Sequence, residues 1–298
     1  MTPCDVVIVN YNAGPLLAEC VGDLLDVTAP PLSIVVVDNG SADDSIGLLP
    51  VDPRLTVILN GENLGFAKAC NVGARAGAAG TILFLNPDCR IDGSALERLQ
   101  SVLLAEARTG MVGGLLLNPD GTEQAGGRRD IPTPATAFGR AFNLRLLGRY
   151  APRALADYSR DGDPLPDHPV EVAAISGALM MVRREALQQV GFWDEGYFLH
   201  VEDLDLCLSL TRAGWHILFV PDARAWHVKG ASSRSRRVFV EWHKHRGMLR
   251  FYRKFMAGQY PKWLMAAVTV AVYGRFAALA ALLTVQQWVE RRLGQRAG

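Results

Sequence analysis

The stretch Thr81-Ile-Leu-Phe-Leu-Asn-Pro-Asp88 decides how this sequence folds. Its first five residues carry no polar alternation, which is typical of a strand covered on both faces by helices. Asn86 and Pro87 favour a turn after the strand, because proline restricts the backbone of the residue before it. The stretch therefore predicts a buried strand that brings the carboxylate of Asp88 to one edge of a sheet.

Similar apolar runs precede this strand, and helical stretches alternate with them. The runs are Val6–Val9, Ile34–Val37 and Thr56–Leu59, and the helical stretches are 14–27, 66–79 and 93–107. Strands that alternate with helices predict an α/β fold with a mostly parallel central sheet, as in nucleotide-binding units. Ligands of such sheets bind at the carboxyl ends of the strands.

The second half of the sequence is less regular. Residues 118–169 are rich in Gly, Pro and Arg, which predicts long loops of the kind that often bind ligands. Ordered structure is expected again at 170–184, with a helix at Glu202–Arg212 and a strand at Ile217–Val220.

The charge of the chain is unevenly distributed. Of 298 residues, 49% are hydrophobic and the net charge is only +1, but residues 224–298 hold 15 of the 31 Lys and Arg and 2 of the 30 Asp and Glu. This region predicts a basic surface for an anionic partner, either membrane headgroups or nucleic acid, with a solvated basic face as the alternative.

The cysteines and the first residues favour a cytoplasmic protein. The five cysteines contain no C-x-x-C pair, so neither a disulfide framework nor a zinc site is indicated, and a reducing compartment fits best. The first residues lack the basic start and long apolar core of a secretion signal.

Two C-terminal stretches predict contact with a membrane. Residues 238–256 interleave aromatic and basic side chains, like an interfacial amphipathic helix. Residues 264–285 are apolar apart from Arg275. Inserting the central Arg into a membrane costs a free energy of about 2.5–3.5 kcal/mol, and inserting the nine Leu, Phe and Val residues contributes roughly 3–5 kcal/mol in favour. The two terms nearly cancel, so the sequence does not decide whether this stretch spans the membrane. We expect peripheral or monotopic attachment to the cytoplasmic face of the inner membrane.

Seven motifs follow one another in a recognisable order. They are Val6-Val-Ile-Val-Asn-Tyr-Asn12, Ile34-Val-Val-Val-Asp-Asn-Gly-Ser41, Asn63-Leu-Gly-Phe-Ala-Lys-Ala-Cys-Asn71, Leu83-Phe-Leu-Asn-Pro-Asp88, Gly177–Arg184 with Val190–Glu195, His200–Leu208 and Val220–His227. Over about residues 5–228 the sequence resembles family 2 glycosyltransferases of the GT-A fold, close to bacterial rhamnosyltransferase-like members. The resemblance implies a catalytic domain at 1–228, with a nucleotide-binding half (1–115) and an acceptor-binding half (116–228), followed by a helical region at 229–298.

The resemblance implies a nucleotide-diphospho-sugar donor bound by the first four motifs. The residues assigned to it are Val9, Asn10, Tyr11, Asn12, Asp38, Asn63, Gly65, Phe66, Lys68, Asn71, Asn86, Pro87 and Asp88. Gly65 would let the backbone approach the ligand closely. Asp38 can accept hydrogen bonds from a base or ribose, or serve only as a turn carboxylate. A structural role for Asn71 and a solvated Lys68 remain alternatives.

The departing diphosphate needs a divalent ion, and hard oxygen ligands suit Mg²⁺ or Mn²⁺. Asp88 is the expected protein ligand. The family's usual D-x-D has Asn86 in its first position here, which leaves the site with one anion fewer. By resemblance His227 completes the metal site, a structural histidine being the alternative.

Three carboxylates, Glu202, Asp203 and Asp205, are too costly to bury unpaired, so they should face a cleft, a helix amino end or a metal. By resemblance Asp203 is the general base, with Glu202 as second candidate. Asp205 is expected to be structural, pairing with Arg212.

The acceptor side is expected to use Gly177, Trp193, Asp194, Glu195, Arg128 and Arg129, with core packing as the alternative for Trp193. Six basic residues in or near the predicted loops are expected either to bind a diphosphate or to be solvated surface charges. They are Arg128, Arg129, Lys229, Arg234, Arg236 and Arg237.

The resemblance and the tail together predict an inverting, metal-dependent transfer of rhamnose from dTDP-rhamnose to a lipid-diphosphate-linked glycan. The enzymatic alternative is another donor, UDP-GlcNAc, UDP-galactofuranose or GDP-mannose, with a polysaccharide or polyprenyl phosphate as acceptor. A remote alternative is a non-enzymatic nucleotide- or nucleic-acid-binding protein, although we expect no nucleic-acid partner.

Overall fold

The computed structural model describes residues 2–134, 159–228 and 236–294. The chain forms two compact units. The first comprises residues 1–131, 159–198 and 202–232, and the second comprises 132–158, 199–201 and 233–298.

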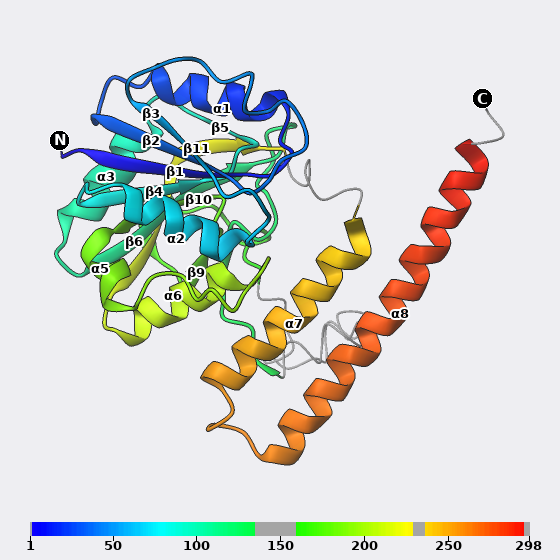
Figure 1. The fold of residues 1–298 in the computed structure, drawn as a ribbon. Helices are drawn as coiled ribbons and strands as arrows, with labels where there is room; N and C mark the ends of the chain where they lie inside the picture. Colours follow the sequence, from blue (N-terminus) through cyan, green and yellow to red (C-terminus); the bar gives the residue numbers. More distant parts are fainter. Residues whose placement is uncertain (1, 135–158, 229–235, 295–298) are drawn as a thin grey trace. The chain divides into compact units, whose positions relative to one another are not determined.

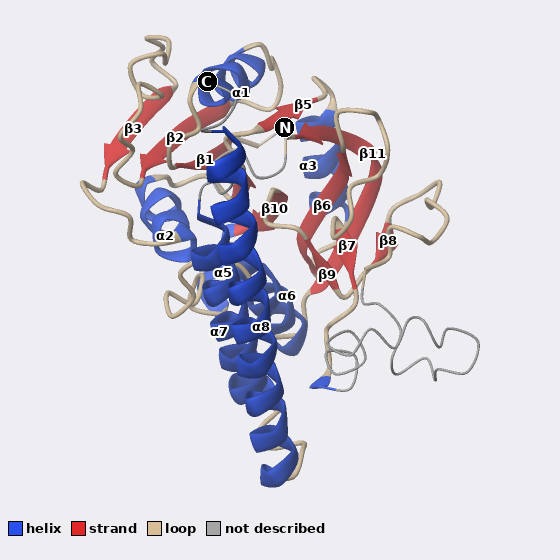
Figure 2. Ribbon diagram, turned by 90° about the vertical axis from the view of Figure 1, so that its right-hand side faces the viewer, coloured by secondary structure: helices blue, strands red, loops and turns tan. Residues whose placement is uncertain are grey.

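The first unit is built on a mixed sheet with the strand order β3-β2-β1-β4-β10-β6-β11-β5 and with β8 paired to β11 (Figure 2). The strands are β1 (Cys4–Asn10), β2 (Leu32–Asp38), β3 (Leu55–Leu59), β4 (Thr81–Leu85), β5 (Cys89–Ile91), β6 (Thr109–Leu117), β8 (Val170–Glu171), β10 (Leu179–Arg183) and β11 (His216–His227). A separate ribbon pairs β7 (Arg128–Arg129) with β9 (Ala174–Ile175). The first four strands along the sheet are parallel, as expected, whereas β10 runs antiparallel to both β4 and β6.

Helices cover both faces of this sheet, so the unit has three layers (Figure 1). They are α1 (Pro15–Leu25), α2 (Phe66–Ala76), α3 (Ala95–Ala105), α5 (Arg184–Gln189) and α6 (Glu202–Arg212). On one face, α1 and α3 pack on the side chains of β1 that include Val6 and Ile8. On the other, α2 lies so close that a Cβ at Gly73 would meet Val7 and Val37. Burial on both faces explains why β1 and β4 show no polar alternation.

Two strands differ from those expected from the sequence. The strand expected at Ile217–Val220 continues to His227, after an irregularity in its pairing with β6 between Val220 and Arg224. Strand β6 itself was not predicted. Its glycines are required by packing, since a Cβ at Gly114 would lie 2.3 Å from the carbonyl oxygen of Ala223. Because β4, β6 and β11 run in the same direction, Asp88 and His227 come to the same edge of the sheet.

The second unit contains the helices α7 (Arg237–Phe255) and α8 (Lys262–Gly294), so both C-terminal stretches are helical, as expected. They pack against each other through aromatic side chains, with ring centroids 5.2 Å apart for Trp242 and Phe276. Residues Lys262–Val289 of α8 are long and apolar enough to cross a membrane by length and composition.

Candidate active site

Asp38 organises the corner where β1 and β2 end. Its Oδ1 accepts hydrogen bonds from Asn10 Nδ2 at 2.8 Å and from Ser41 Oγ at 2.6 Å. Its Oδ2 accepts the backbone N–H groups of Gly40 and Ser41 at 3.1 and 3.0 Å. The N–H of Asn12 donates to Ser41 Oγ at 2.9 Å. Asp38 therefore orders the turn after β2, next to the buried Val9 and the half-buried Tyr11.

The loop before α2 is held by Asn63 and Gly65. Asn63 Oδ1 accepts the N–H of Gly65 at 3.0 Å. Gly65 has a φ of +87°, and a Cβ there would lie 2.7 Å from the carbonyl oxygen of Phe198, which accepts the N–H of Phe66 at 2.8 Å. A backbone contact within the protein is thus enough to require glycine at this position. The Lys68 side chain is exposed, which fits the solvated alternative.

Asn71 ties α2 to the segment that follows α5. Its Nδ2 donates to the carbonyl oxygen of Trp193 and to Glu195 Oε1, both at 2.9 Å, and its Oδ1 accepts the Trp193 N–H at 3.0 Å. The Trp193 ring is 1% exposed and packs edge-on against Phe84 at 5.0 Å and Phe66 at 5.9 Å. This geometry supports the structural alternative for both Asn71 and Trp193.

Asp88, after β4, meets His227, the last residue of β11. Asp88 Oδ1 lies 3.1 Å from His227 Nε2, and both side chains are 9% exposed. The carbonyl oxygen of Asp88 also accepts the N–H of Val228 at 3.0 Å. Asn86 Nδ2 lies 3.4 Å from the same ring nitrogen. Both expected metal ligands are therefore in direct contact.

This pair fits a hard divalent ion. Carboxylate oxygen and imidazole nitrogen both donate electron pairs, and an ion that binds both at about 2.1 Å with a right angle between the bonds holds them about 3.0 Å apart. Cys89 Sγ belongs to the same cluster, but burial, followed by the charge of Asp88, raises the pKa of its thiol well above the usual range. A neutral thiol is a poor ligand for Mg²⁺ or Mn²⁺, which leaves Asp88 and His227 as the residues that could hold the ion.

Gln124 lies behind His227 and carries no signal in the sequence that would mark it. Its Oε1 is 2.7 Å from His227 Nδ1, and its Nε2 donates to the carbonyl oxygen of His227 at 3.1 Å. It is 4% exposed and belongs to a segment that the sequence predicted only as loop.

At the start of α6, Asp203 is held by Arg129 of β7. Arg129 Nη2 lies 2.5 Å from Asp203 Oδ2, which also accepts the N–H of Gly177 at 3.3 Å. Burial alone would raise the pKa of Asp203, but the Arg129 guanidinium, helped by the N–H groups of Leu204 and Gly177, holds this pKa below its usual value. Asp203 is therefore ionised at neutral pH.

Glu202 is in the opposite state. It is 6% exposed, and its Oε2 has no hydrogen-bond partner within the described residues. Burial, followed by the negative charge of Asp203, raises the pKa of Glu202 to about 8. Of the two carboxyls, Asp203 is thus the one available to accept a proton at pH 7. Asp205 accepts hydrogen bonds from Tyr197 Oη at 2.9 Å and Ser209 Oγ at 3.3 Å, which are structural contacts.

The turn at Gly177 and Ala178 links the start of α6, which carries Asp203, to the segment after β4, which carries Asp88. The Gly177 N–H donates to Asp203, and the carbonyl oxygen of Ala178 accepts the N–H of Asn86 at 3.1 Å, two residues before Asp88. The ionised Asp203 and the segment that carries Asp88 are therefore bound to adjacent residues of one turn in the first unit.

The remaining acceptor-side residues are mostly engaged. Arg128 is 5% exposed and pairs with Glu123 through two contacts at 2.8 and 3.1 Å. Asp194 Oδ1 accepts the N–H of Gly196 at 2.9 Å. Of the other expected cations, Arg236 and Arg237 are exposed at the start of α7, and Lys229 and Arg234 lie outside the described residues.

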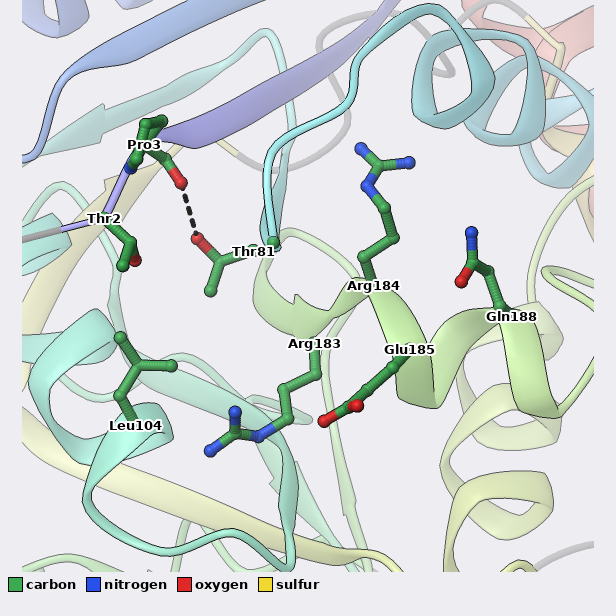
Figure 3. Close-up of a pocket in the computed structure, with 9 residues that line it drawn as sticks. Thr2, Pro3, Thr81, Leu104, Arg183, Arg184, Glu185 and Gln188 are labelled. Carbon is green, nitrogen blue, oxygen red and sulfur yellow. Dashed lines mark hydrogen bonds between the residues drawn. The ribbon is translucent and has the colours of Figure 1, made fainter.

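A separate hollow of about 550 Å³ lies at the opposite edge of the sheet, where β1 and β4 begin (Figure 3). Two arginines line it, but both guanidinium groups bind other parts of the protein. Arg183 donates to the carbonyl oxygens of Leu103 and Glu106, and Arg184 donates to that of Ala74 and to Asp5. These contacts stabilise helix ends, so the hollow offers no free guanidinium to a ligand.

Residues 3–239 match the family described as glycosyltransferase-like family 2. The chain belongs to this family. The transferase is 31% identical over 240 residues to the N-acetylglucosaminyl-diphospho-decaprenol L-rhamnosyltransferase of Mycobacterium tuberculosis, a match that covers 76% of each chain. It is 25% identical over 230 residues to the dTDP-rhamnosyl transferase RfbF of Shigella flexneri, covering 76% of this chain and 69% of the relative.

Solved structures share the fold of the transferase. GalNAc-T7 with UDP, GalNAc and Mn²⁺ superposes with a TM-score of 0.60 at 19% identity, over 85% of this chain and 48% of that one. The mannosyltransferase PcManGT of Pyrobaculum calidifontis, with GDP-Man and Mn²⁺, gives 0.58 at 16% identity, over 96% and 79%. The fold is thus the expected GT-A fold, and the expectation of a glycosyltransferase is confirmed.

Proposed function

We propose that the transferase moves rhamnose from dTDP-rhamnose to a lipid-diphosphate-linked glycan that ends in N-acetylglucosamine, and that it inverts the anomeric carbon. Relatives whose names specify a rhamnosyl donor and a diphospho-decaprenol acceptor support the choice of substrates. The observation that supports the mechanism is that ionised Asp203 accepts the N–H of Gly177, while Asn86, two residues before Asp88, donates its N–H to the carbonyl oxygen of the adjacent Ala178.

In this mechanism Asp203 accepts the proton of the acceptor hydroxyl while the hydroxyl oxygen attacks the anomeric carbon. The bond to the diphosphate breaks on the opposite side, so one displacement inverts the configuration without a covalent intermediate. A divalent ion bound by Asp88 and His227 would neutralise the charge that develops on the departing diphosphate. Because Asn86 supplies an amide and no charge, Asp88 would be the principal negatively charged protein ligand of the ion.

We also propose that the C-terminal helices attach the enzyme to an anionic membrane surface at the cytoplasmic face. The apolar side chains of α8 are largely exposed, with Trp263 71% and Val270 73% exposed. Arg275, in the middle of α8, is exposed. Burial raises the pKa of Glu241 in α7, but Lys244, His245 and Arg275 outweigh it and lower this pKa. Arg275 therefore carries its charge on the exposed surface of α8, within electrostatic reach of Glu241.

The packing of the two helices favours surface attachment over a full span. The contact between Trp242 and Phe276 sets the middle of α8 against α7. The C-terminal part of α7 is strongly basic, with Lys244, Arg246, Arg250, Arg253 and Lys254. If α8 crossed the bilayer, these residues would enter the hydrocarbon at a cost of about 2.5–3.5 kcal/mol each. In the interface they would meet anionic headgroups.

Transfer to a defined lipid tests the proposed reaction. The full chain is incubated with Mg²⁺, dTDP-rhamnose labelled in the sugar and N-acetylglucosaminyl-diphospho-polyprenol. We expect label in the lipid extract and a product linkage of opposite anomeric configuration to the donor. Transfer only from UDP-GlcNAc, UDP-galactofuranose or GDP-mannose would replace the donor, and retention of configuration would contradict the single displacement.

A further inference from the structure

We propose that Gln124 is a positioning residue of the metal site and that it fixes the imidazole of His227 in the tautomer whose Nε2 lone pair faces Asp88. The proposal rests on the metal site of the proposed function and adds a residue that the sequence motifs do not contain. Gln124 itself would not touch the ion, since it contacts the imidazole at Nδ1, whereas Asp88 lies against Nε2.

The orientation of the Gln124 amide follows from its partners. Gln124 Nε2 lies 3.1 Å from the carbonyl oxygen of His227, which can only accept a hydrogen bond. The same nitrogen lies 3.1 Å from Asn118 Oδ1, and Asn118 Nδ2 in turn donates to Thr122 Oγ1 at 2.9 Å. This chain of donors and acceptors assigns the NH₂ group to the two oxygens and leaves Gln124 Oε1 as an acceptor.

The orientation of Gln124 determines the tautomer of His227. Gln124 Oε1 is 2.7 Å from Nδ1 and can only accept, so Nδ1 carries the N–H. In the neutral ring the lone pair is then on Nε2, the atom 3.1 Å from Asp88 Oδ1 and 3.4 Å from the amide nitrogen of Asn86. Metal-binding histidines use this arrangement, in which the second ring nitrogen donates to an oxygen that fixes the ring.

The competing explanation is that Gln124 only fastens the loop at 118–124 to β11. Gln100 offers a matched control for that role. It is 2% exposed and its Nε2 donates to the carbonyl oxygen of Thr2 at 2.9 Å and to Thr81 Oγ1 at 3.1 Å, at the edge of the sheet away from Asp88. Gln100→Leu therefore removes a buried amide without touching the proposed metal site.

Two measurements on the full chain test the proposal. The first is the ¹⁵N NMR spectrum of histidine-labelled wild-type protein with Mg²⁺, in which the signal of His227 is assigned by its loss in His227→Asn. We expect a protonated Nδ1 and a metal-bound Nε2. The second is titration with Mn²⁺ alone, followed by electron paramagnetic resonance. Gln124→Leu should weaken Mn²⁺ binding about 10–100-fold, whereas Gln100→Leu should leave it unchanged.

The variant Gln124→Glu loses the donor to Asn118 and to the His227 carbonyl oxygen but keeps an acceptor for Nδ1–H, so it should lose less than about tenfold in Mn²⁺ affinity. If Gln124→Leu does not fold, this variant and the wild-type spectrum decide. A protonated Nε2 with bare Nδ1 in the Mg²⁺ complex would overturn the proposal, and so would unchanged Mn²⁺ affinity in folded Gln124→Leu. Those results leave the metal site itself standing, whereas a wild-type chain that binds no Mn²⁺ would overturn both.

Discussion

Arg129 and Asp203 form an ion pair in which Nη2 lies 2.5 Å from Oδ2 and both side chains are 14% exposed. The guanidinium stabilises the ionised form of a carboxylate whose burial alone would have the opposite effect. The same residue that keeps the proposed base ionised also lowers its affinity for a proton. The pKa of Asp203 thus depends on a partner from a different part of the chain.

Loss of Arg129 should move the acid limb of the pH–rate profile. In the wild type the pKa of Asp203 is lowered, so kcat/KM should show no loss from Asp203 protonation between pH 5 and 8. In Arg129→Met burial dominates, the pKa of Asp203 rises and the acid limb should enter this range. Arg128→Met, which breaks the neighbouring pair with Glu123, serves as the control. An unchanged profile in Arg129→Met would contradict the assignment of Asp203 as base.

The two adjacent carboxyls should differ sharply when each is replaced by its amide. Asp203→Asn removes the proton acceptor and should reduce kcat about 10²–10⁴-fold with donor binding intact. Glu202→Gln replaces a group that is already neutral at pH 7 and should reduce kcat less than about tenfold. Steady-state kinetics with donor binding measured by calorimetry distinguish them. The reverse order of effects would make Glu202 the base.

Glu202 should also make the enzyme less stable as the pH rises. Its pKa is about 8 in the folded protein and near 4.5 in the unfolded chain, so the folded state holds more protons between these values. Stability should therefore fall from about pH 4.5 to 8 because of this group. Glu202→Gln should raise the free energy of unfolding at pH 8.5 by on the order of 2 kcal/mol, and by less at pH 5. Urea unfolding at the two pH values measures the difference, and an equal effect at both would rule out the buried acid.

Attachment to membranes should depend on both charge and the apolar face of α8. We expect the full chain to float with vesicles of phosphatidylcholine and phosphatidylglycerol, to float less at high salt, and to sediment with phosphatidylcholine alone. Replacing Trp263 and Trp288 by serine should reduce flotation, because both indole rings are exposed. Flotation that is insensitive to salt and to these substitutions would argue against an electrostatic surface attachment.

Much of the fold could be predicted because burial leaves a simple pattern. The unbroken apolar runs of β1 and β4, and the turn chemistry after Leu85, identified strands and the edge where they end. Strand β6 was not predicted since three glycines lower its strand propensity, and their requirement appears only when Gly114 meets the backbone of Ala223.

The candidate site could be predicted in its residue types but not in its pairings. Asp88 and His227 were expected as ligands, and the structure brings them together, although their role stays a prediction. The contact of Gln124 with His227 joins residues that are distant in sequence, and a buried Gln carries no pattern of its own. The pairing of Arg129 with Asp203 was hidden for the same reason, so Arg129 was predicted only as an acceptor-binding cation.

The metal-dependent use of a nucleotide sugar is tested most directly by a competition among donors. The enzyme is incubated with N-acetylglucosaminyl-diphospho-polyprenol as acceptor and with dTDP-rhamnose, UDP-GlcNAc, UDP-galactofuranose and GDP-mannose together, with Mn²⁺ or with EDTA, and the consumption of each donor is measured by chromatography. We predict that dTDP-rhamnose alone is consumed, that EDTA or Asp88→Ala abolishes consumption, and that Asn86→Asp changes only the Mn²⁺ concentration required. Consumption that persists in EDTA and in Asp88→Ala would contradict the account.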